Sequence, residues 1–225
     1  GAGERPYTDY VSGEECTGGN CDRRADYLKA ATDLLVSDLE EMVAAWGEGG
    51  EARETVMEDE NAGIVAMLTG MGSLSYGEQA GERMRLGLML NDPEEEHDCF
   101  SDNTHNSHYY DGKGIQNVYL GEYQQVNGET LSGPSLSDLV AANDPAVDSQ
   151  LKQAFEASEA ALQALVDSAN TGVHFDQLIA PGNAQGAATV NAAIDSLVTQ
   201  TTGIEKAALV LNIQALNPDT ADHEF

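Results

Sequence analysis

Apolar side chains recur every three or four positions over most of the chain, which is the spacing of one face of an α-helix. The clearest example lies in residues 22–46, where six apolar residues follow this spacing: Leu28, Ala31, Leu35, Leu39, Met42 and Trp46. Glycines at positions 47, 49 and 50 are typical of the end of a helix. The pattern predicts a helix over residues 22–46 with a single apolar stripe.

The same periodicity predicts helices on both sides of a segment that lacks it. Asp144 is a favourable N-cap and Pro145 suits the first position of a helix, so we expect a long helix to begin there. The other helices are expected over residues 51–69, 76–90, 136–142 and about 183–216. Strand signals are nearly absent, which predicts an all-α fold, most simply an antiparallel helical bundle.

The segment 91–134 is rich in Asp, Asn, His, Gly and Tyr and has only weak periodicity. We expect two short helices in it, near residues 101–110 and 114–120, joined by loops. The chain therefore divides into four stretches: a loop over 1–21, helices over 22–90, an irregular His- and Asp-rich segment over 91–134, and helices over 135–225.

The charge of the chain narrows its possible partners. Ten basic and 39 acidic residues give a formal net charge of −29. Nucleic-acid binding and polybasic contact with a membrane both need a basic surface, so we expect neither. No apolar run approaches the 18 residues of a membrane span, and we expect no transmembrane segment. The acidic surface fits either adaptation to a salty environment or an ordinary exported protein.

The three cysteines leave several pairings open. Cys16 and Cys21 bracket a tight loop that a disulfide could close, Cys99 could pair with either of them, and all three could be reduced thiols. A zinc ribbon would need a second pair, and haem c attachment would need a C-x-x-C-H motif. No phosphate-binding loop, nucleophile elbow or H-E-x-x-H helix occurs, so we expect no nucleotide, no haem c and no zincin site.

Residues 91–108 hold the densest group of chemically active side chains, with three of the five histidines and six carboxylates. If residues 101–110 are helical, Ser101, His105 and His108 share a face and Asp102 lies one turn before His105. Imidazole and carboxylate together suit iron, zinc or a similar metal. An oxygen-rich calcium site is a weaker possibility because the EF-hand order is missing. The alternative is a solvated acidic loop.

A second candidate lies on the helix predicted over residues 76–90. Glu78, Glu82 and Arg85 fall on one face, and two glutamates one turn apart favour a nearby cation. The alternative is a solvated face balanced by Arg83 and Arg85. His174 comes just before Phe175 and Asp176 at a helix start, and we expect it to be structural.

Seven stretches of the sequence resemble the imelysin-like family, and the iron-regulated protein A branch in particular. They are GAGERPYTDY at 1–10, CTGGNCDRR at 16–24, YL at 27–28, GERM at 81–84, EEHDCFSDNTH at 95–105, GIQNVYLG at 114–121 and HFD at 174–176. The resemblance implies two four-helix-bundle halves facing across a groove. It also implies export to the bacterial periplasm, outer membrane or cell exterior, a link to iron uptake, and for some members M75 metallopeptidase activity.

The G-x-H-x-x-E motif of that family is absent from this chain, which starts at the stretch following it. We therefore expect the chain to be the C-terminal portion of a duplicated four-helix-bundle protein, with the missing N-terminal portion as a partner. Whether these residues form an enzyme is left open by the missing motif.

The resemblance and the polar segment together imply a protein that binds iron, another divalent metal or a small iron-bearing ligand in the groove. The expected metal ligands are Glu82, His97, Asp102 and His105, supported by Glu78, Arg83 and Glu95. One alternative is an M75-type metallopeptidase in its full-length form. A second is an acidic structural or assembly protein of the cell surface.

Overall fold

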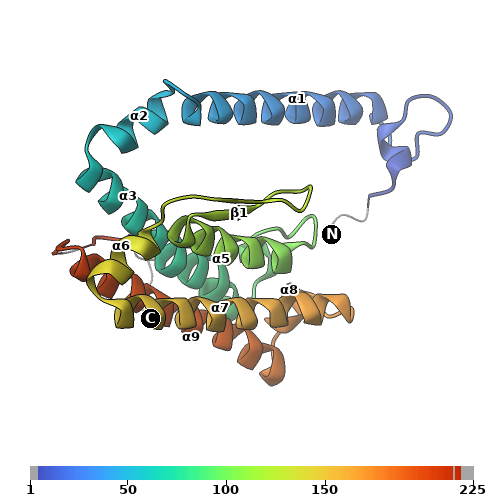
Figure 1. The fold of residues 1–225 in the computed structure, drawn as a ribbon. Coiled ribbons are helices and arrows are strands. Elements are labelled where there is room, and N and C mark those ends of the chain that lie inside the picture. The colour runs from blue at the N-terminus through green and yellow to red at the C-terminus, as the bar shows by residue number, and fades with distance from the viewer. Residues whose placement is uncertain (1–4, 215, 219–225) are drawn as a thin grey trace. The chain divides into compact units, whose positions relative to one another are not determined.

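The computed structural model of the chain describes residues 5–214 and 216–218, and helices dominate that part (Figure 1). The expected all-α class is confirmed, with one small addition, a two-stranded hairpin. The chain divides into two compact units, Gly1–Gly63 and Ile64–Phe225, and each is described here by itself.

The first unit contains the 3-10 helix η1 (Tyr7–Tyr10) and the helices α1 (Cys21–Trp46) and α2 (Glu51–Glu58). A disulfide joins Cys16 to Cys21 and closes the loop that leads into α1. Of the pairings that the sequence left open, the structure contains the disulfide between Cys16 and Cys21, and Cys99 is a free thiol.

The apolar stripe of α1 lies on the predicted helix but does not form a core. Its large members are between 53% and 58% exposed: Leu28, Leu35, Leu39, Met42 and Trp46. Within the described residues of the first unit, the elements that pack on α1 are η1 and α2, which cover only its ends. Periodicity alone placed the helix correctly, but it does not say what covers an apolar face.

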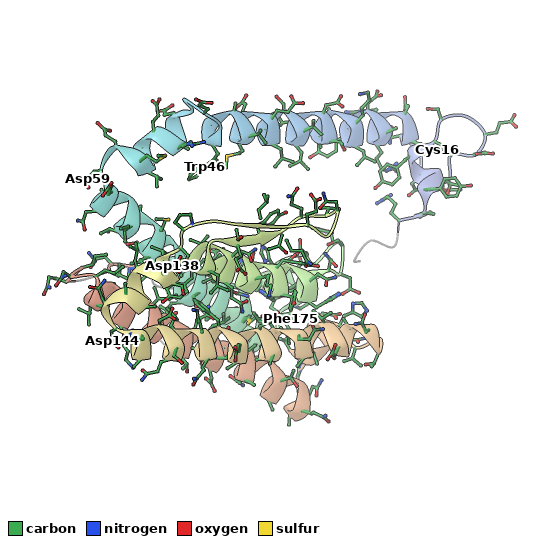
Figure 2. The ribbon with its side chains drawn as sticks, in the orientation of Figure 1. Cys16, Trp46, Asp59, Asp138, Asp144 and Phe175 are labelled. Carbon is green, nitrogen blue, oxygen red and sulfur yellow. A yellow bond between two sulfur atoms is a disulfide. The ribbon has the colours of Figure 1, made fainter. Side chains whose placement is uncertain are left out.

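The prediction of a single helix over residues 51–69 is wrong, because the helix is interrupted at Asp59 (Figure 2). The Asp59 side chain accepts hydrogen bonds from the backbone N–H groups of Asn61 and Ala62. It thereby acts as the N-cap of a new helix, α3 (Glu60–Ser73). The helix predicted over residues 76–90 also differs, since α3 continues directly into a π-helix, η2 (Leu74–Arg85), and then into α4 (Leu86–Leu90).

Buried polar side chains tie η2 to helix α9 (Ala184–Val210). The Ser75 hydroxyl donates to the backbone oxygen of Leu197 at 3.0 Å, and the Gln200 amide donates to the Ser75 oxygen at 2.8 Å. The π-helix is a rare, wide helix that occurs mostly as short insertions, often at functional sites. A twelve-residue stretch of it is a feature that hydrophobic periodicity does not predict.

The second unit packs η2 and helix α5 (Thr104–Leu120) against two long helices, α7 (Pro145–Asn170) and α9, which lie side by side (Figure 1). The short helices η3 (Pro93–Glu95), α6 (Leu136–Asn143) and α8 (Phe175–Leu178) connect them. Two apolar clusters form the core. The first includes Leu68, Tyr119, Leu151, Phe155 and Ile204, and the second includes Met84, Leu162, Leu165, Phe175 and Ile194.

The structure confirms one helix start predicted for this unit and corrects other limits. Asp144 caps α7 as predicted, accepting from the N–H groups of residues 146 and 147. Helix α9 ends at Val210 instead of near residue 216. The two short helices expected near 101–110 and 114–120 are one helix, α5. Residues 122–132 form a hairpin, β1 (Glu122–Gln124) and β2 (Thr130–Ser132), in which Glu122 pairs with Ser132.

Helix α5 contains a glycine, Gly112, that allows close packing. Gly112 faces Leu162 of α7 so closely that a methyl group at this position would collide with the end of the leucine side chain. A glycine inside a helix usually weakens it, and residues 111–113 were expected to lie in a loop between two short helices. Close helix contact compensates for that cost.

A buried hydrogen-bond network joins α5, α6 and α7. Asp148 accepts hydrogen bonds from the Tyr119 hydroxyl at 3.0 Å, the Ser137 hydroxyl at 2.7 Å and the Lys152 ammonium at 2.9 Å. Burial alone would raise the pKa of the Asp148 carboxyl, but the hydrogen bonds from Lys152, Ser137 and Tyr119 outweigh it and the pKa is lowered. The folded state therefore favours the ionised carboxylate.

We expect Asp148→Asn to reduce the free energy of unfolding at neutral pH by about 1–3 kcal/mol, because charged acceptors make stronger hydrogen bonds. A lowered folded-state pKa gives stability that is complete above the pKa of the unfolded chain, whose ordinary value is 3.8. That stability is lost as the pH falls through the folded-state value. Denaturant unfolding at pH 7 and pH 3 should therefore show the difference from the natural chain shrinking in acid. Asp195→Asn, at an exposed position of α9, is the matched control, and an equal loss there would contradict the prediction.

Candidate metal centre

Three side chains near the start of α5 form the only group of described His, Cys, Asp and Glu residues with metal-ligand spacing. One ligand atom from each of His97, His108 and Asp111 lies within 4.8 Å of the others. His97 Nδ1 is 3.5 Å from Asp111 Oδ2, and the rings of His97 and His108 are 5.7 Å apart. His108 and Asp111 lie three positions apart on α5 and thus share a face, and His97 comes from the turn between η3 and α5.

His108 is fully buried, and its ring lies 5.3 Å from that of Phe175. Among the described residues, neither of its ring nitrogens has a hydrogen-bond partner. Burial, together with electrostatic interaction with His97 and Arg83, lowers the pKa of His108 to about 3. The imidazole is therefore neutral, with a lone pair on one nitrogen and a proton on the other.

An unsatisfied buried imidazole is costly, by roughly 1–3 kcal/mol for each polar group left without a partner. A metal ion bound to one nitrogen would supply the missing interaction, and neutral imidazole is the form that binds metals. The residues present therefore fit a metal: a buried neutral histidine, a second histidine and a carboxylate within ligand distance of one another.

The neighbours of the Asp111 carboxyl shift its pKa in opposite directions. Burial raises its pKa, as do Asp98 and Glu78, whereas electrostatic interaction with His97 and Arg83 lowers it. Burial has the largest influence on this carboxyl, and its pKa is raised overall, so the folded chain disfavours the charged form. A cation at this position would reverse that preference by pairing with the carboxylate.

Helix η2 contributes a hydrogen bond and two charged side chains to the surroundings of this group. The Gln79 amide donates a hydrogen bond of 2.7 Å to the backbone oxygen of His108, and both groups are buried. Arg83 pairs with Glu78 at 2.8 Å, and both charges act on Asp111. The π-helix therefore fixes the backbone that carries the buried histidine. Glu78 and Arg83 were expected to support a metal site with other ligands; in the structure their charges act on Asp111.

Among the described residues, the four ligands expected from the sequence do not form one group with metal-ligand spacing. Of these, only His97 belongs to the group with metal-ligand spacing in the described part of the chain. Asp102 and His105 lie beside His174 instead: His174 Nδ1 is 3.1 Å from Asp102 Oδ2, and the rings of His105 and His174 are 5.5 Å apart, edge to face. Glu82 on η2 and Glu95 at the end of η3 are not members of the group either.

His174 has a structural role, as expected, because it takes part in a capping box with Gln177 at the start of α8. It also connects this cap to the turn before α5 through Asp102. Glu96, which precedes His97, is 7% exposed, and its Oε2 atom has no hydrogen-bond partner among the described residues. Burial raises the pKa of Glu96, and nearby Asp176, Asp102 and Asp98 raise it further against the hydrogen bond with Thr104.

Sequence reasoning did not identify His108 and Asp111 as members of this group. Their H-x-x-D spacing would have indicated a shared face, but only if residues 101–120 were read as one helix. The expected interruption near Gly112 and Gly114 placed Asp111 in a loop, where spacing carries no such information.

The centre opens onto a depression of about 540 Å³. Its lining consists of His97, Asn103, Asn106, Ser107, Tyr110 and Asp111. Two of the three members of the group thus face this depression, whereas His108 is buried. An ion held by the three side chains would be within reach of molecules from solution.

Comparison with known proteins gives one match that covers most of the chain. The family model described as imelysin, Peptidase_M75, matches residues 1–204. No curated protein matches the chain. In the described part, none of the helices combines the length and the apolar character of a membrane span.

Proposed function

The chain belongs to the imelysin family, Peptidase_M75, and on that premise we propose that it binds a divalent transition-metal ion at His97, His108 and Asp111. The observation that carries the proposal is the buried neutral His108, which lacks hydrogen-bond partners and lies within ligand distance of a second histidine and a carboxylate. The two imidazoles and the carboxylate would hold the ion, and Gln79 would keep His108 in place.

The ligand set favours iron, or zinc and similar ions, over calcium and magnesium. Imidazole nitrogen suits iron, zinc, copper and nickel, whereas calcium and magnesium prefer oxygen ligands alone. Two histidines with one carboxylate are typical of iron(II) sites that keep open positions. A role in iron acquisition is consistent with this set and with the resemblance to iron-regulated family members.

Export from the cytoplasm is part of the same proposal. The disulfide between Cys16 and Cys21 favours an oxidising compartment, because disulfides rarely persist in reducing cytosol. A periplasmic, outer-membrane-associated or extracellular location would therefore suit the protein.

Metal binding is better supported than peptide hydrolysis. A metallopeptidase needs a carboxylate or similar base that is free to take a proton from the attacking water. The two carboxylates that act on Asp111 are both engaged: Asp98 accepts a hydrogen bond from the Ser107 hydroxyl, and Glu78 is paired with Arg83. Glu96 has an unpartnered oxygen, but it is buried and is not part of the depression lining.

Calorimetric titration of the metal-free chain tests the proposal. We expect iron(II), added without oxygen, and zinc(II) to bind with one ion per chain, and calcium to bind far more weakly at the same ionic strength. Exposed acidic side chains would bind all three ions weakly and alike. Equal binding of calcium and zinc, or no saturable site for zinc and iron, would rule out a centre built from histidines.

A further inference from the structure

The three proposed ligands leave part of the coordination sphere of an ion open. His97, His108 and Asp111 offer one ligand atom each, whereas sites of two histidines and one carboxylate keep several positions for other molecules. His108 is buried, and the depression is lined by His97 and Asp111. An ion held by these side chains would therefore be accessible from the depression and not from the core.

The depression is larger than water ligands require. A water molecule takes about 30 Å³ of liquid volume, so three of them would fill roughly 90 Å³. The depression holds about 540 Å³, which is in the range of sites for small molecules. A bound molecule several times the size of water would fit beside the ion.

The remaining lining is polar and uncharged. The Asn106 amide donates to the Asn103 side-chain oxygen at 2.8 Å, which aligns the two amides. Asn103 Nδ2, Asn106 Oδ1 and the Tyr110 hydroxyl do not take part in that pairing. Tyr110 is 66% exposed and its ring contacts that of Tyr109. These groups can donate to and accept from the oxygen atoms of a ligand.

The lining contains no Lys or Arg, so an anion would gain little from the depression without the ion. Recognition would depend on the metal first and on hydrogen bonds second. This combination suits a molecule with two oxygens close enough to bind one ion, and with further oxygens or N–H groups at its edge.

We propose that the depression binds a small bidentate oxygen chelator, such as a hydroxamate or a dicarboxylate, as a second ligand of the metal. Its two oxygens fill open positions of the ion, and its outer edge bonds to Asn103, Asn106 and Tyr110. This inference rests on the proposed metal site.

Equilibrium dialysis with radiolabelled oxalate and cobalt(II) as the probe ion tests the inference. We expect the cobalt-loaded chain to retain one oxalate per ion, and the metal-free chain to retain none. Loss of two hydrogen bonds in the double variant Asn106→Ala, Tyr110→Phe should weaken oxalate binding about tenfold. Cobalt affinity measured without oxalate should change less than about twofold, because neither residue is a ligand.

Tyr123→Phe is the matched control, since Tyr123 is a 52% exposed tyrosine on β1 and is not part of the depression lining. It should leave oxalate binding unchanged, and circular dichroism should show all variants folded. Retention of oxalate by the double variant at full affinity would overturn the inference, as would release of cobalt from the natural chain when oxalate is added. Failure of cobalt alone to bind the natural chain would overturn the proposed metal site as well.

Discussion

Replacing His108 by leucine is expected to weaken zinc or iron(II) binding by roughly a hundredfold or more, since even the residues that merely orient a ligand are worth ten- to a hundredfold. The metal-free chain should be as stable as the natural one or more stable. The imidazole has no hydrogen-bond partner to lose, and leucine fills a similar volume beside Phe175. Calorimetry gives the metal affinity, and denaturant unfolding gives the stability.

His105→Ala is the matched control. It removes a histidine that lies three positions away on the same helix, next to His174 and outside the group with metal-ligand spacing. We expect the metal affinity to change by less than about threefold. A loss of binding in His105→Ala with His108→Leu unaffected would instead support the ligand set expected from the sequence. If His108→Leu strongly destabilised the metal-free chain, the buried histidine would have a structural role.

The second large effect is expected in the packing between α5 and α7. Leu162→Ala should reduce the free energy of unfolding by about 2–5 kcal/mol, because Leu162 is fully buried and its truncation leaves a cavity. Gly112→Ala alone should also destabilise the chain, by about 1–3 kcal/mol, because the added methyl group would collide with Leu162.

The two changes should compensate each other when combined. The methyl group of Gly112→Ala would occupy space vacated in Leu162→Ala, so the double variant should lose less stability than the sum of the two single losses. Thermal or denaturant unfolding of the four proteins measures this coupling. Additive losses would show that Gly112 and Leu162 do not determine how closely the two helices approach. Because Gly112 follows Asp111 directly, the same variants would show whether this contact also positions the metal centre.

Much of the helical framework could be predicted from the spacing of apolar residues. The helix that begins after Asp144 has its cap and its buried residues where expected, because local capping and periodicity are sufficient for a long amphipathic helix. The break at Asp59, the π-helix and the continuous α5 were missed. Each of these features is accompanied by side-chain contacts that apolar spacing does not report: the cap formed by Asp59, the bonds of Ser75 to α9, and the fit of Gly112 against Leu162.

The candidate site was predicted only in its location along the chain. The sequence pointed to the polar segment around His97 and to iron or a similar metal. The sequence could not show which of the histidines belong to the site, because His105 and His108 are neighbours on one helix and differ mainly in burial. His108 lies under Phe175, and Asp111 lies one turn farther on toward His97. The choice between the two histidines depends on contacts with residues far along the chain, which spacing does not contain.

By itself, the sequence determined the all-α class, the imelysin resemblance, the acidic character and the segment that carries the histidines. These follow from local periodicity, composition and motifs, which need no knowledge of how helices pack. Only the tertiary structure decided which side chains meet. It placed His97 beside His108 and Asp111 and placed Asp102 and His105 beside His174. The reason is physical: burial and ligand distance are set by packing between η2, α5 and α8, elements that are separated in the sequence and adjoin only in the folded chain.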